Sequence, residues 1–336
     1  MKARCDWQPN VDLTNENTLR LPVNAQWFSA PTTLPALQHC VRQSDRTEAV
    51  HVLGGGSNVL LPEQLDGRVI HPALHQWWLE AQDDDVLAHV GAGVNWHALV
   101  MTLAEKGLWG IENLALIPGD CGAAPVQNIG AYGVELADVL DAVQIMYLAD
   151  GSVDWLTNEA CAFGYRDSIF KNALQGKVII TRLILRLKRH AEPKLGYGDL
   201  SERVGDNPSS ADVAHAVCQV RQEKLPDPAE LANAGSFFKN PLVSARQAEA
   251  LLNRYPALPH FAQPDGAFKL AAGWLIDQCG LKGARFGPFG VHERQALVLV
   301  HFGGGDRAAL LDVADHVAAT VEARFGVALE VEPRIL

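Results

Sequence analysis

Two polar residues lie within apolar segments and have side chains suited to binding an anion and moving a proton. Arg166, in FGYRDSIFK, follows Tyr165, and its guanidinium offers a planar fork of donors that matches a carboxylate or a phosphate. Ser236, in NAGSFFKNP, stands between Gly235 and two phenylalanines, so its hydroxyl can point into a dry cleft. Each has a simpler interpretation as well: a surface ion pair between Arg166 and Asp167, and a structural serine.

A glycine cluster has the composition of a phosphate-binding loop. It consists of Gly54, Gly55, Gly56, Ser57 and Asn58. Glycines allow several backbone N–H groups to point at one anion, and the two polar side chains add donors. A glycine hairpin is the simpler alternative, since the spacing of the cluster matches neither a dinucleotide fingerprint nor a Walker loop. A second run, Gly303–Gly305, precedes the acidic Asp306 and is interpreted as a plain connection.

Metal and hydrolase sites find little support. His71 and His75 are four residues apart but flank Pro72, and His292-Glu293 lacks a second histidine at zinc-binding spacing. No Gly-x-Ser-x-Gly motif occurs. The cysteines form no Cys-x-x-Cys pair, which argues against a disulfide framework and a structural zinc site and favours a reducing cytoplasm. They are Cys5, Cys40, Cys121, Cys161, Cys218 and Cys279.

The composition is that of a globular protein of two or three domains. The 336 residues are 48% hydrophobic and 20% charged, with a net charge of −11. The acidic balance disfavours nucleic acid as a partner. No secretory signal and no apolar run of membrane-spanning length is found, so a cytoplasmic protein without a membrane partner is expected.

Strands dominate the first part of the chain. The segment from Ala49 to Leu61 predicts a strand, a tight excursion and a second strand, and residues 177–189 show the alternation of a half-buried strand. Further strands are expected at residues 68–71, 77–81, 86–90, 141–148 and 152–156, the last two joined by a turn at Asp150-Gly151. Asn95 predicts the cap of a helix that ends before Gly107.

Helices dominate after a domain boundary near Leu225. They are expected at residues 210–224, 244–255, 267–279 and 306–325, with strands at 296–301 and 327–331. The segment from Ile117 to Glu135 is too rich in glycine and alanine for an ordinary helix and too apolar for a solvated loop. Such a stretch typically lets a ligand approach the backbone closely.

Taken together, the motifs resemble the UDP-N-acetylenolpyruvoylglucosamine reductase family over nearly the whole chain. The family's ordered segments appear here as LGGGSNVLL, IPG…PVQNIGAYGVEL, GYRDSIFK, KLPDP, GSFFKNP, AAGWLIDQCGLKG and an end carrying Glu332. Each segment alone is weak, but the ordered set is specific.

The resemblance implies an α+β fold, with a two-subdomain FAD-binding fold of the flavin-oxidase kind and an α+β substrate-binding domain. The expected parts are residues 1–74 and 75–225 for the two FAD-binding subdomains, 226–325 for the UDP-sugar domain, and 326–336 for a strand that returns to the flavin site. A monomer is expected.

The resemblance also implies non-covalent FAD, with NADPH as the hydride-donating co-substrate. The residues expected to bind FAD are Gly54, Gly55, Gly56, Ser57, Asn58, Ile117, Pro118, Gln127, Ile129, Gly130 and Arg334. The glycine cluster would take the pyrophosphate, and residues 117–133 would line the isoalloxazine. Serines of some members are replaced here by Ala123 and Ala124, which removes any hydroxyl contact from those positions.

The implied reaction reduces UDP-N-acetylglucosamine enolpyruvate to UDP-N-acetylmuramate for peptidoglycan synthesis. Arg166 and Glu332, the latter protonated or sharing a proton, would polarise the substrate carboxylate while the reduced flavin delivers hydride to C3. Ser236 would then protonate C2. Substrate contacts are expected from Tyr132, Tyr165, Tyr197, Lys224, Asn240, Lys282 and Gln295, where Tyr197 marks the family type with a tyrosine-bearing loop.

Two other functions remain open on the sequence. One is an FAD-dependent oxidase of the same fold, which would have no use for Ser236 as a proton donor. The other is a non-catalytic module that binds flavin or UDP-sugar, which would not require Arg166, Ser236 and Glu332. Pro333, directly after Glu332, can shift the position of that carboxylate.

Overall fold

The computed structural model describes residues 5–44 and 48–336, which form two compact units. The first contains the described residues up to Val11 together with those of Asn24–Gly56 and Gln64–Glu223, and the second contains Asp12–Val23, Ser57–Glu63 and Lys224–Leu336. Each unit has its own hydrophobic core. Both units are therefore assembled from segments that are distant in the sequence.

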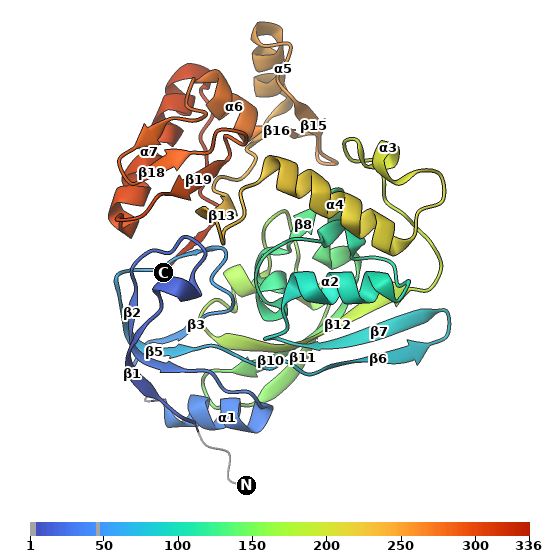
Figure 1. Ribbon diagram of the computed structural model, residues 1–336, viewed down its shortest axis with the longest axis vertical. Coiled ribbons are helices and arrows are strands. Elements are labelled where there is room, and N and C mark those ends of the chain that lie inside the picture. The colour runs from blue at the N-terminus through green and yellow to red at the C-terminus, as the bar shows by residue number, and fades with distance from the viewer. Residues whose placement is uncertain (1–4, 45–47) are drawn as a thin grey trace. The chain divides into compact units, whose positions relative to one another are not determined.

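An antiparallel five-stranded sheet is the framework of the first unit, in the order β11-β10-β12-β7-β6 (Figure 1). Its strands are β6 (Trp77–Gln82), β7 (Asp85–Gly91), β10 (Leu140–Tyr147), β11 (Val153–Thr157) and β12 (Val178–Lys188). In β12, Leu183, Leu185 and Leu187 are fully buried, which confirms the predicted alternation. The predicted turn at Asp150-Gly151 joins β10 to β11, and Gly151 has φ +72°.

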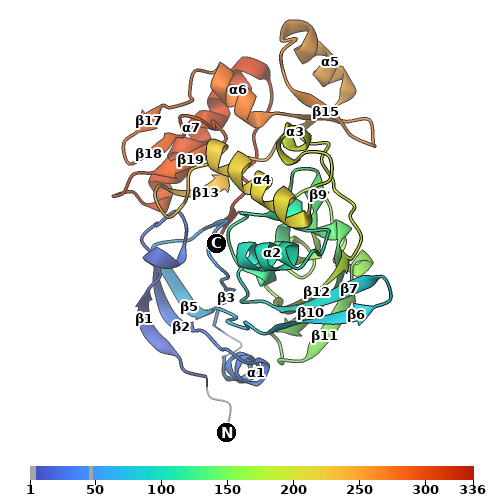
Figure 2. The ribbon, with the colours of Figure 1, turned by 45° about the vertical axis from the view of Figure 1, so that its right-hand side comes forward.

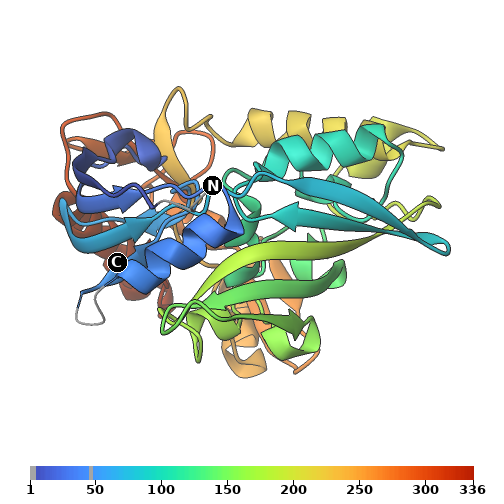
Figure 3. The same ribbon diagram turned by 90° about the horizontal axis from the view of Figure 1, so that it is seen from below.

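Helices cover both faces of this sheet. Helices α2 (Trp96–Glu105) and α4 (Ser210–Lys224) share one core with β7, β10 and β12 and lie on the same side (Figure 2). Helix α1 (Leu34–Gln43) packs on the other face against Met146 and Ile179 (Figure 3). Asn95 caps α2 as predicted, its side chain accepting the Ala98 N–H at 3.0 Å. The short helix α3 spans Leu200–Val204.

A smaller sheet carries the glycine cluster. Its order is β1-β2-β5-β3, with β1 (Gln8–Asp12), β2 (Asn24–Ser29), β3 (Val50–Val52) and β5 (Gln64–Ile70). Strands β2 and β3 both run parallel to β5. Strand β4 (Val59–Leu60), beyond the glycines, pairs with β20 (Arg334–Ile335) instead of β3. The predicted strand, excursion and strand are confirmed, but the alternative of a glycine hairpin is wrong.

The second unit combines a four-stranded sheet, in the order β13-β19-β18-β17, with a three-stranded sheet, β14-β16-β15. Their strands are β13 (Ala232–Ser236), β14 (Leu242–Val243), β15 (His260–Ala262), β16 (Phe268–Leu270), β17 (Arg285–Phe286), β18 (Phe289–Val291) and β19 (Val298–His301). The helices are α5 (Ala245–Arg254), α6 (Ala272–Gln278) and α7 (Arg307–Phe325). Asp306 caps α7 and Gly326 ends it, as the sequence predicts.

Short elements complete the chain. They are β8 (Gly130–Ala131), β9 (Val134–Glu135), and the 3-10 helices η1 (Thr14–Glu16), η2 (Glu112–Leu114), η3 (Cys121–Gln127), η4 (Leu136–Asp138), η5 (Glu159–Cys161) and η6 (Ile169–Lys171). Within the described ranges, no helix is long and apolar enough to cross a membrane. The same residues contain no group of three histidine, cysteine or acidic side chains arranged to hold a metal ion.

Two predicted elements are wrong in detail. The helix expected over residues 267–279 begins only at Ala272, because Phe268–Leu270 pairs as β16 with strands on both sides. The strand expected at 327–331 is reduced to a single bridge between Val331 and Phe238, and regular pairing starts at Arg334. Both corrections arise from pairing partners that are distant in the sequence.

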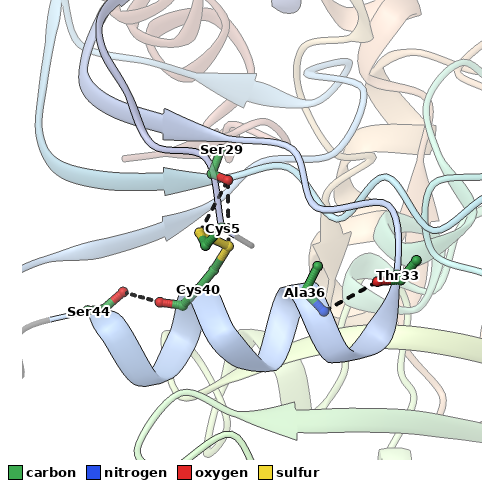
Figure 4. The surroundings of a disulfide bond; sticks show 6 residues. All are labelled: Cys5, Ser29, Thr33, Ala36, Cys40 and Ser44. Atoms are coloured by element: carbon green, nitrogen blue, oxygen red, sulfur yellow. Dashed lines mark hydrogen bonds between the residues drawn. A yellow bond between two sulfur atoms is a disulfide. The ribbon is translucent and has the colours of Figure 1, made fainter. Parts of the chain in front are cut away.

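The cysteine spacing argued against a disulfide framework, and it missed one disulfide bond. Cys5 and Cys40 are bonded, with their Cα atoms 5.1 Å apart and 35 positions separating them in the sequence. Cys40 lies on the buried face of α1, and the Ser29 hydroxyl lies 3.5 Å from both sulfurs (Figure 4). Sequence spacing missed the pair because the fold, and not a local motif, brings the two thiols together.

Candidate functional site

Several residues in or near the segment predicted to line the isoalloxazine have a left-handed backbone conformation. In the first unit, Leu116, Asn128, Tyr132 and Arg166 have φ values between +46° and +58°, a region that L-residues with side chains seldom adopt. Each such residue costs on the order of 1 kcal/mol or more, and strain of this kind concentrates at functional sites. The segment from residue 116 to 133 is therefore held by its surroundings and not by local preference.

Asn128 is the main anchor of this segment. Its side chain is buried and donates to the Glu135 carboxylate at 2.8 Å and to the Gly164 carbonyl at 3.1 Å. Its Oδ1 accepts the Ala137 N–H at 2.9 Å. These bonds tie the segment to the loop that carries Arg166.

Arg166 points its guanidinium at the same backbone. Nη2 donates to the Gly130 carbonyl at 2.8 Å and Nη1 to the Asn128 carbonyl at 3.4 Å. A Cβ on Gly130 would lie 3.1 Å from Nη1, so a larger residue there would crowd the guanidinium. The Asp167 carboxylate accepts from Asn172, at 3.0 and 3.2 Å, so the surface pair considered from the sequence does not account for the position of Arg166.

The glycine loop packs against the same segment. A Cβ on Gly55 would come within 2.9 Å of the Gly119 Cα, and one on Gly54 would touch Ala123 at 3.4 Å. Gly56 has φ +61°, which glycine adopts without strain. Two segments predicted separately to bind FAD therefore meet in the first unit.

Tyr132 and Tyr197 also come together there. Their rings lie edge to face with centroids 5.5 Å apart, and the Asn113 amide donates to the Tyr132 carbonyl at 2.9 Å. Burial raises the pKa of the Tyr132 hydroxyl, so this group remains a hydrogen-bond donor at neutral pH. Tyr165 lies under Arg166, with 5.4 Å between its ring centroid and the guanidinium carbon.

In the second unit, Ser236 and Glu332 lie on neighbouring stretches of backbone. The Glu332 N–H donates to the Phe237 carbonyl at 2.9 Å, and the Lys239 N–H donates to the Glu330 carbonyl at 2.9 Å. Phe237 and Phe238 are buried and fix the stretch that follows Ser236. The structure thus brings together two residues that are about a hundred positions apart in the sequence.

Arg334 follows directly after this region. Its N–H donates to the Asn58 carbonyl at 3.0 Å, within the pairing of β20 with β4, and Ser57 precedes that strand. Its Nε is buried and has no hydrogen-bond partner among the described residues. Burial lowers the pKa of Arg334, but a guanidinium remains charged at neutral pH. An unsatisfied buried donor of this kind is suited to a ligand.

The remaining predicted substrate residues have structural contacts of their own. The Asn240 Oδ1 accepts the Ala272 N–H at the start of α6, at 3.0 Å. The Lys282 ammonium pairs with Asp277 at 2.6 Å, the Gln295 side chain accepts the Leu297 N–H at 3.4 Å, and Lys224 is exposed at the end of α4. Their substrate roles stay predictions.

The other predicted flavin contacts flank η3. Ile117 and Pro118 precede it, Gln127 is its last residue, and Ile129 is a buried residue of the same core. The Ile129 N–H donates to the Ala124 carbonyl at 3.2 Å. Their contact with a cofactor likewise stays a prediction.

Sequence reasoning missed two polar groups near this segment. The His97 Nδ1 accepts the Leu116 N–H at 3.0 Å, and Arg221 acts electrostatically on both His97 and Tyr132. The position of Arg221 in its helix could have indicated it, because Arg221 falls in register with the buried Ala214 and Val217 of α4. A charged residue on the apolar stripe of a helix is unusual and marks a candidate site.

Comparison with protein families gives two matches. Residues 25–157 match the FAD binding domain family, and residues 227–336 match the C-terminal domain of UDP-N-acetylenolpyruvoylglucosamine reductase. Together the two matches cover most of both units.

Curated relatives carry the same reductase name. The chain is 48% identical to the UDP-N-acetylenolpyruvoylglucosamine reductase of Chromobacterium violaceum, over 98% of this chain and 99% of that protein. It is 53% identical to that of Cupriavidus pinatubonensis, over 85% of each chain.

Solved structures agree with this. A UDP-N-acetylenolpyruvylglucosamine reductase from Thermus caldophilus is 26% identical with a TM-score of 0.69, covering 99% of this chain and 98% of the other. A 6-hydroxy-D-nicotine oxidase from Arthrobacter nicotinovorans shares the fold, with a TM-score of 0.51 at 14% identity over 96% of this chain and 86% of the other.

Proposed function

Because this chain belongs to the UDP-N-acetylenolpyruvoylglucosamine reductase family, we propose that Arg166, Ser236 and Glu332 carry out its reaction. The protein is an FAD-containing oxidoreductase that uses NADPH to reduce UDP-N-acetylglucosamine enolpyruvate to UDP-N-acetylmuramate in peptidoglycan synthesis. The oxidase alternative is not favoured, since the likeness to an oxidase extends to the fold alone.

The residues of this chain fit FAD. The glycine loop approaches residues 119–123 so closely that a Cβ at Gly55 would collide with backbone, and the Arg334 Nε is a buried donor without a partner among the described residues. We propose that Gly54–Asn58 hold the pyrophosphate, that Ile117, Pro118, Gln127, Ile129 and Gly130 line the ring system, and that Arg334 donates to it. When bound there, FAD would supply the hydride-transfer chemistry that links NADPH to the substrate's double bond.

Arg166 is proposed to bind the substrate carboxylate. Its guanidinium is oriented by two backbone carbonyls, so little side-chain entropy is lost when a ligand binds. Hydride addition at C3 leaves negative charge on C2 that spreads into the carboxylate, and a fixed cation stabilises that charge as it develops.

Ser236 is proposed to protonate C2, with Glu332 acting on the same carboxylate as Arg166. The observation that supports this assignment is the hydrogen bond from the Glu332 N–H to the Phe237 carbonyl, which makes the two residues neighbours in the second unit. A protonated Glu332 donates a hydrogen bond to the carboxylate, whereas an ionised one would repel it.

The substrate contacts are proposed for Tyr132, Tyr165, Tyr197, Lys224, Asn240, Lys282 and Gln295. The edge-to-face contact between Tyr132 and Tyr197 supports the proposal for these two tyrosines. Lys224 and Lys282 supply positive charge for a diphosphate on an acidic protein.

We further propose that the protein acts as a monomer in the cytoplasm, without a nucleic-acid or membrane partner. Each unit has a core of its own, and the net charge of −11 disfavours a polyanionic partner.

The substitution Ser236→Ala tests the proposed mechanism. Removing the proton donor lowers turnover by about 10²- to 10⁴-fold, while FAD content and reduction by NADPH stay at the wild-type level. Ser201→Ala, at an exposed position of α3, is the matched control and leaves turnover unchanged. Full turnover in FAD-loaded Ser236→Ala would refute the role of Ser236.

A further inference from the structure

A single buried amide joins the loop that carries Tyr197 to the segment that carries Tyr132. The amide belongs to Asn113, which lies in η2 of the first unit and is fully buried. Its Nδ2 donates to the Tyr132 carbonyl at 2.9 Å and to the Lys194 carbonyl at 2.8 Å. Because an amide nitrogen has two hydrogens, each carbonyl takes one of them. Asn113 therefore bridges two segments that are distant in the sequence.

The support of Asn113 is rigid. Its neighbours Glu112 and Leu114 are both buried. The Leu114 N–H donates to the Ile111 carbonyl at 2.9 Å, and the Leu114 carbonyl accepts the Trp96 indole N–H at 3.0 Å. The amide of Asn113 is thus a fixed point to which the loop is attached.

The loop that carries Tyr197 has few other contacts. Residues 190–198 connect β12 to α3 without a helix or strand of their own. None of their backbone groups bonds to another backbone group within the described part of the chain. The Lys194 ammonium pairs with Asp138 at 3.0 Å, but both are exposed and such pairs contribute little. The hydrogen bond from Asn113, with the packing of Leu195 against the core, sets where this backbone lies.

Stability alone is a weak reason for an asparagine at this position. Its Oδ1 is buried and has no hydrogen-bond partner among the described residues. An unpaired buried acceptor costs free energy, which offsets what the two hydrogen bonds contribute. Turning the amide over would place Oδ1 against two carbonyl oxygens, so the amide has one orientation. A leucine of similar size would avoid the unpaired acceptor, but it could not hold the two carbonyls.

What Asn113 holds in place is the pair of tyrosines. Tyr132 has φ +51°, and its ring meets that of Tyr197 edge to face, with the centroids 5.5 Å apart. Such a contact forms only when both backbones keep the rings at this spacing. Asn113 bonds to the backbone of Tyr132 itself and to that of Lys194, shortly before Tyr197.

We propose that Asn113 is a positioning residue that holds Tyr197 against Tyr132 for binding of the substrate. This inference rests on the proposed function, in which both tyrosines contact the UDP-sugar. Asn113 acts through the loop and touches neither substrate nor cofactor. Its effect on affinity therefore requires the side chain of Tyr197.

A double-mutant cycle tests this dependence. Calorimetric titration of the oxidised, FAD-loaded enzyme with UDP-N-acetylglucosamine enolpyruvate gives the dissociation constants of wild type, Asn113→Leu, Tyr197→Ala and the double variant. We expect each single substitution to weaken binding by about fivefold or more. The double variant should bind within about twofold of Tyr197→Ala, whereas independent effects would multiply.

Asn158→Leu is the matched control. The Asn158 Nδ2 also donates to two backbone carbonyls, those of Ala137 and Leu140, at 2.7 Å each, and neither belongs to the loop. The same loss of two hydrogen bonds should therefore leave the affinity for the substrate unchanged. Thermal unfolding and the flavin absorbance per chain verify that each variant is folded and retains FAD.

Asn113→Asp gives a second, independent measurement. An ionised carboxylate offers no donor to the two carbonyls, whereas a protonated one offers a single O–H. The affinity of this variant relative to wild type should therefore rise as pH falls. A general loss of packing would not show this pH dependence.

Three results would overturn the inference: wild-type affinity in folded Asn113→Leu, effects that multiply in the cycle, or loss of FAD from both Asn113 variants. If Tyr197→Ala alone left the affinity unchanged, the proposed substrate contact of Tyr197 would fail together with the inference. A clear effect of Tyr197→Ala with multiplying effects in the cycle refutes the inference alone.

Discussion

At the scale of residues, the candidate site is defined by side chains and backbone that are held against their preferences. Arg166 and Tyr132 both adopt left-handed backbone conformations. The Asn128 side chain ties its own segment to Glu135, Ala137 and Gly164 through three hydrogen bonds. Strain of this kind persists only where the surroundings impose it. The free-energy cost of this strain is expected at a site whose charged groups must be in place before the substrate binds.

Glu112 gives a pH-dependent prediction at this scale. It is buried, its carboxylate accepts the Gly110 N–H at 2.6 Å, and burial raises its pKa despite this bond. The folded state then binds the proton more tightly than the unfolded state, so the stability that Glu112 contributes is present at low pH and is lost as pH rises through the folded pKa. Glu112→Gln keeps an acceptor oxygen and removes the charge.

We therefore expect Glu112→Gln to increase the free energy of unfolding at pH 7 by on the order of 1 kcal/mol. The increase should shrink as pH falls and the wild-type carboxyl becomes neutral as well. Denaturant unfolding across this pH range measures it, with Glu105→Gln, at an exposed position of α2, as the control. A variant less stable than the wild type at pH 7 would contradict the account.

Arg166 and Ser236 could be proposed as site residues from the sequence because each stands alone as a polar residue in apolar or glycine-rich surroundings. Arg221, in contrast, occurs in a helix with several other polar residues, and His97 is the second residue of α2. Whether their side chains are buried depends on what α2 and α4 pack against, which no local pattern specifies.

At the scale of elements, the glycine loop after β3 and the segment around η3 depend on each other. Gly55→Ala would place a Cβ 2.9 Å from the Gly119 Cα, and because that neighbour is backbone it cannot move aside cheaply. We expect a loss of about 1–3 kcal/mol in unfolding free energy and reduced FAD retention. Calorimetry and the flavin absorbance per chain measure both.

Gly164→Ala is the comparison for this prediction. Its Cβ would make an ordinary contact of 3.7 Å with the Asp167 Cβ, so the unfolding temperature should stay the same. Equal stability losses in Gly55→Ala and Gly164→Ala would show that the close approach at Gly119 is not the cause.

The disulfide makes a second prediction at this scale, since Cys5–Cys40 ties the start of the chain to α1. Alkylation of denatured protein purified without reductant should modify the four free cysteines, and prior reduction should raise that number to the six of the sequence. The bond lowers the entropy of the unfolded chain and so stabilises the folded protein by about 4 kcal/mol. A lower unfolding temperature of Cys5→Ser measures this effect. Six modified cysteines without reductant would contradict the bond.

Elements with local signals could be predicted well. Helix α2 has its cap at Asn95, α7 has a cap at Asp306 and a stop at Gly326, and β12 alternates throughout. Strand β16 could not be predicted, because it forms by pairing with β14 and β15. The stretch before Arg334 could not be predicted either, because only single hydrogen bonds to residues 237–239 hold it in place. Pairing of distant segments is decided by the tertiary fold.

At the scale of the whole molecule, the residues proposed to carry out the reaction are distributed over two units. The first contains Arg166, Tyr132 and the glycines Gly54–Gly56, and the second contains Ser236 and Glu332. The second unit also takes up Asp12–Val23 and Ser57–Glu63 from the N-terminal part of the chain. Composition gives no indication of such exchange, because these segments differ from their neighbours only in what they pair with.

The most direct test of the account is an anaerobic titration of the purified, FAD-loaded protein. NADPH should bleach the flavin absorbance, and UDP-N-acetylglucosamine enolpyruvate should then restore it with formation of UDP-N-acetylmuramate. If the absorbance recovered only in oxygen and not with this substrate, the reductase account would be contradicted and an oxidase favoured. Protein that bound no FAD would contradict the account at its first step.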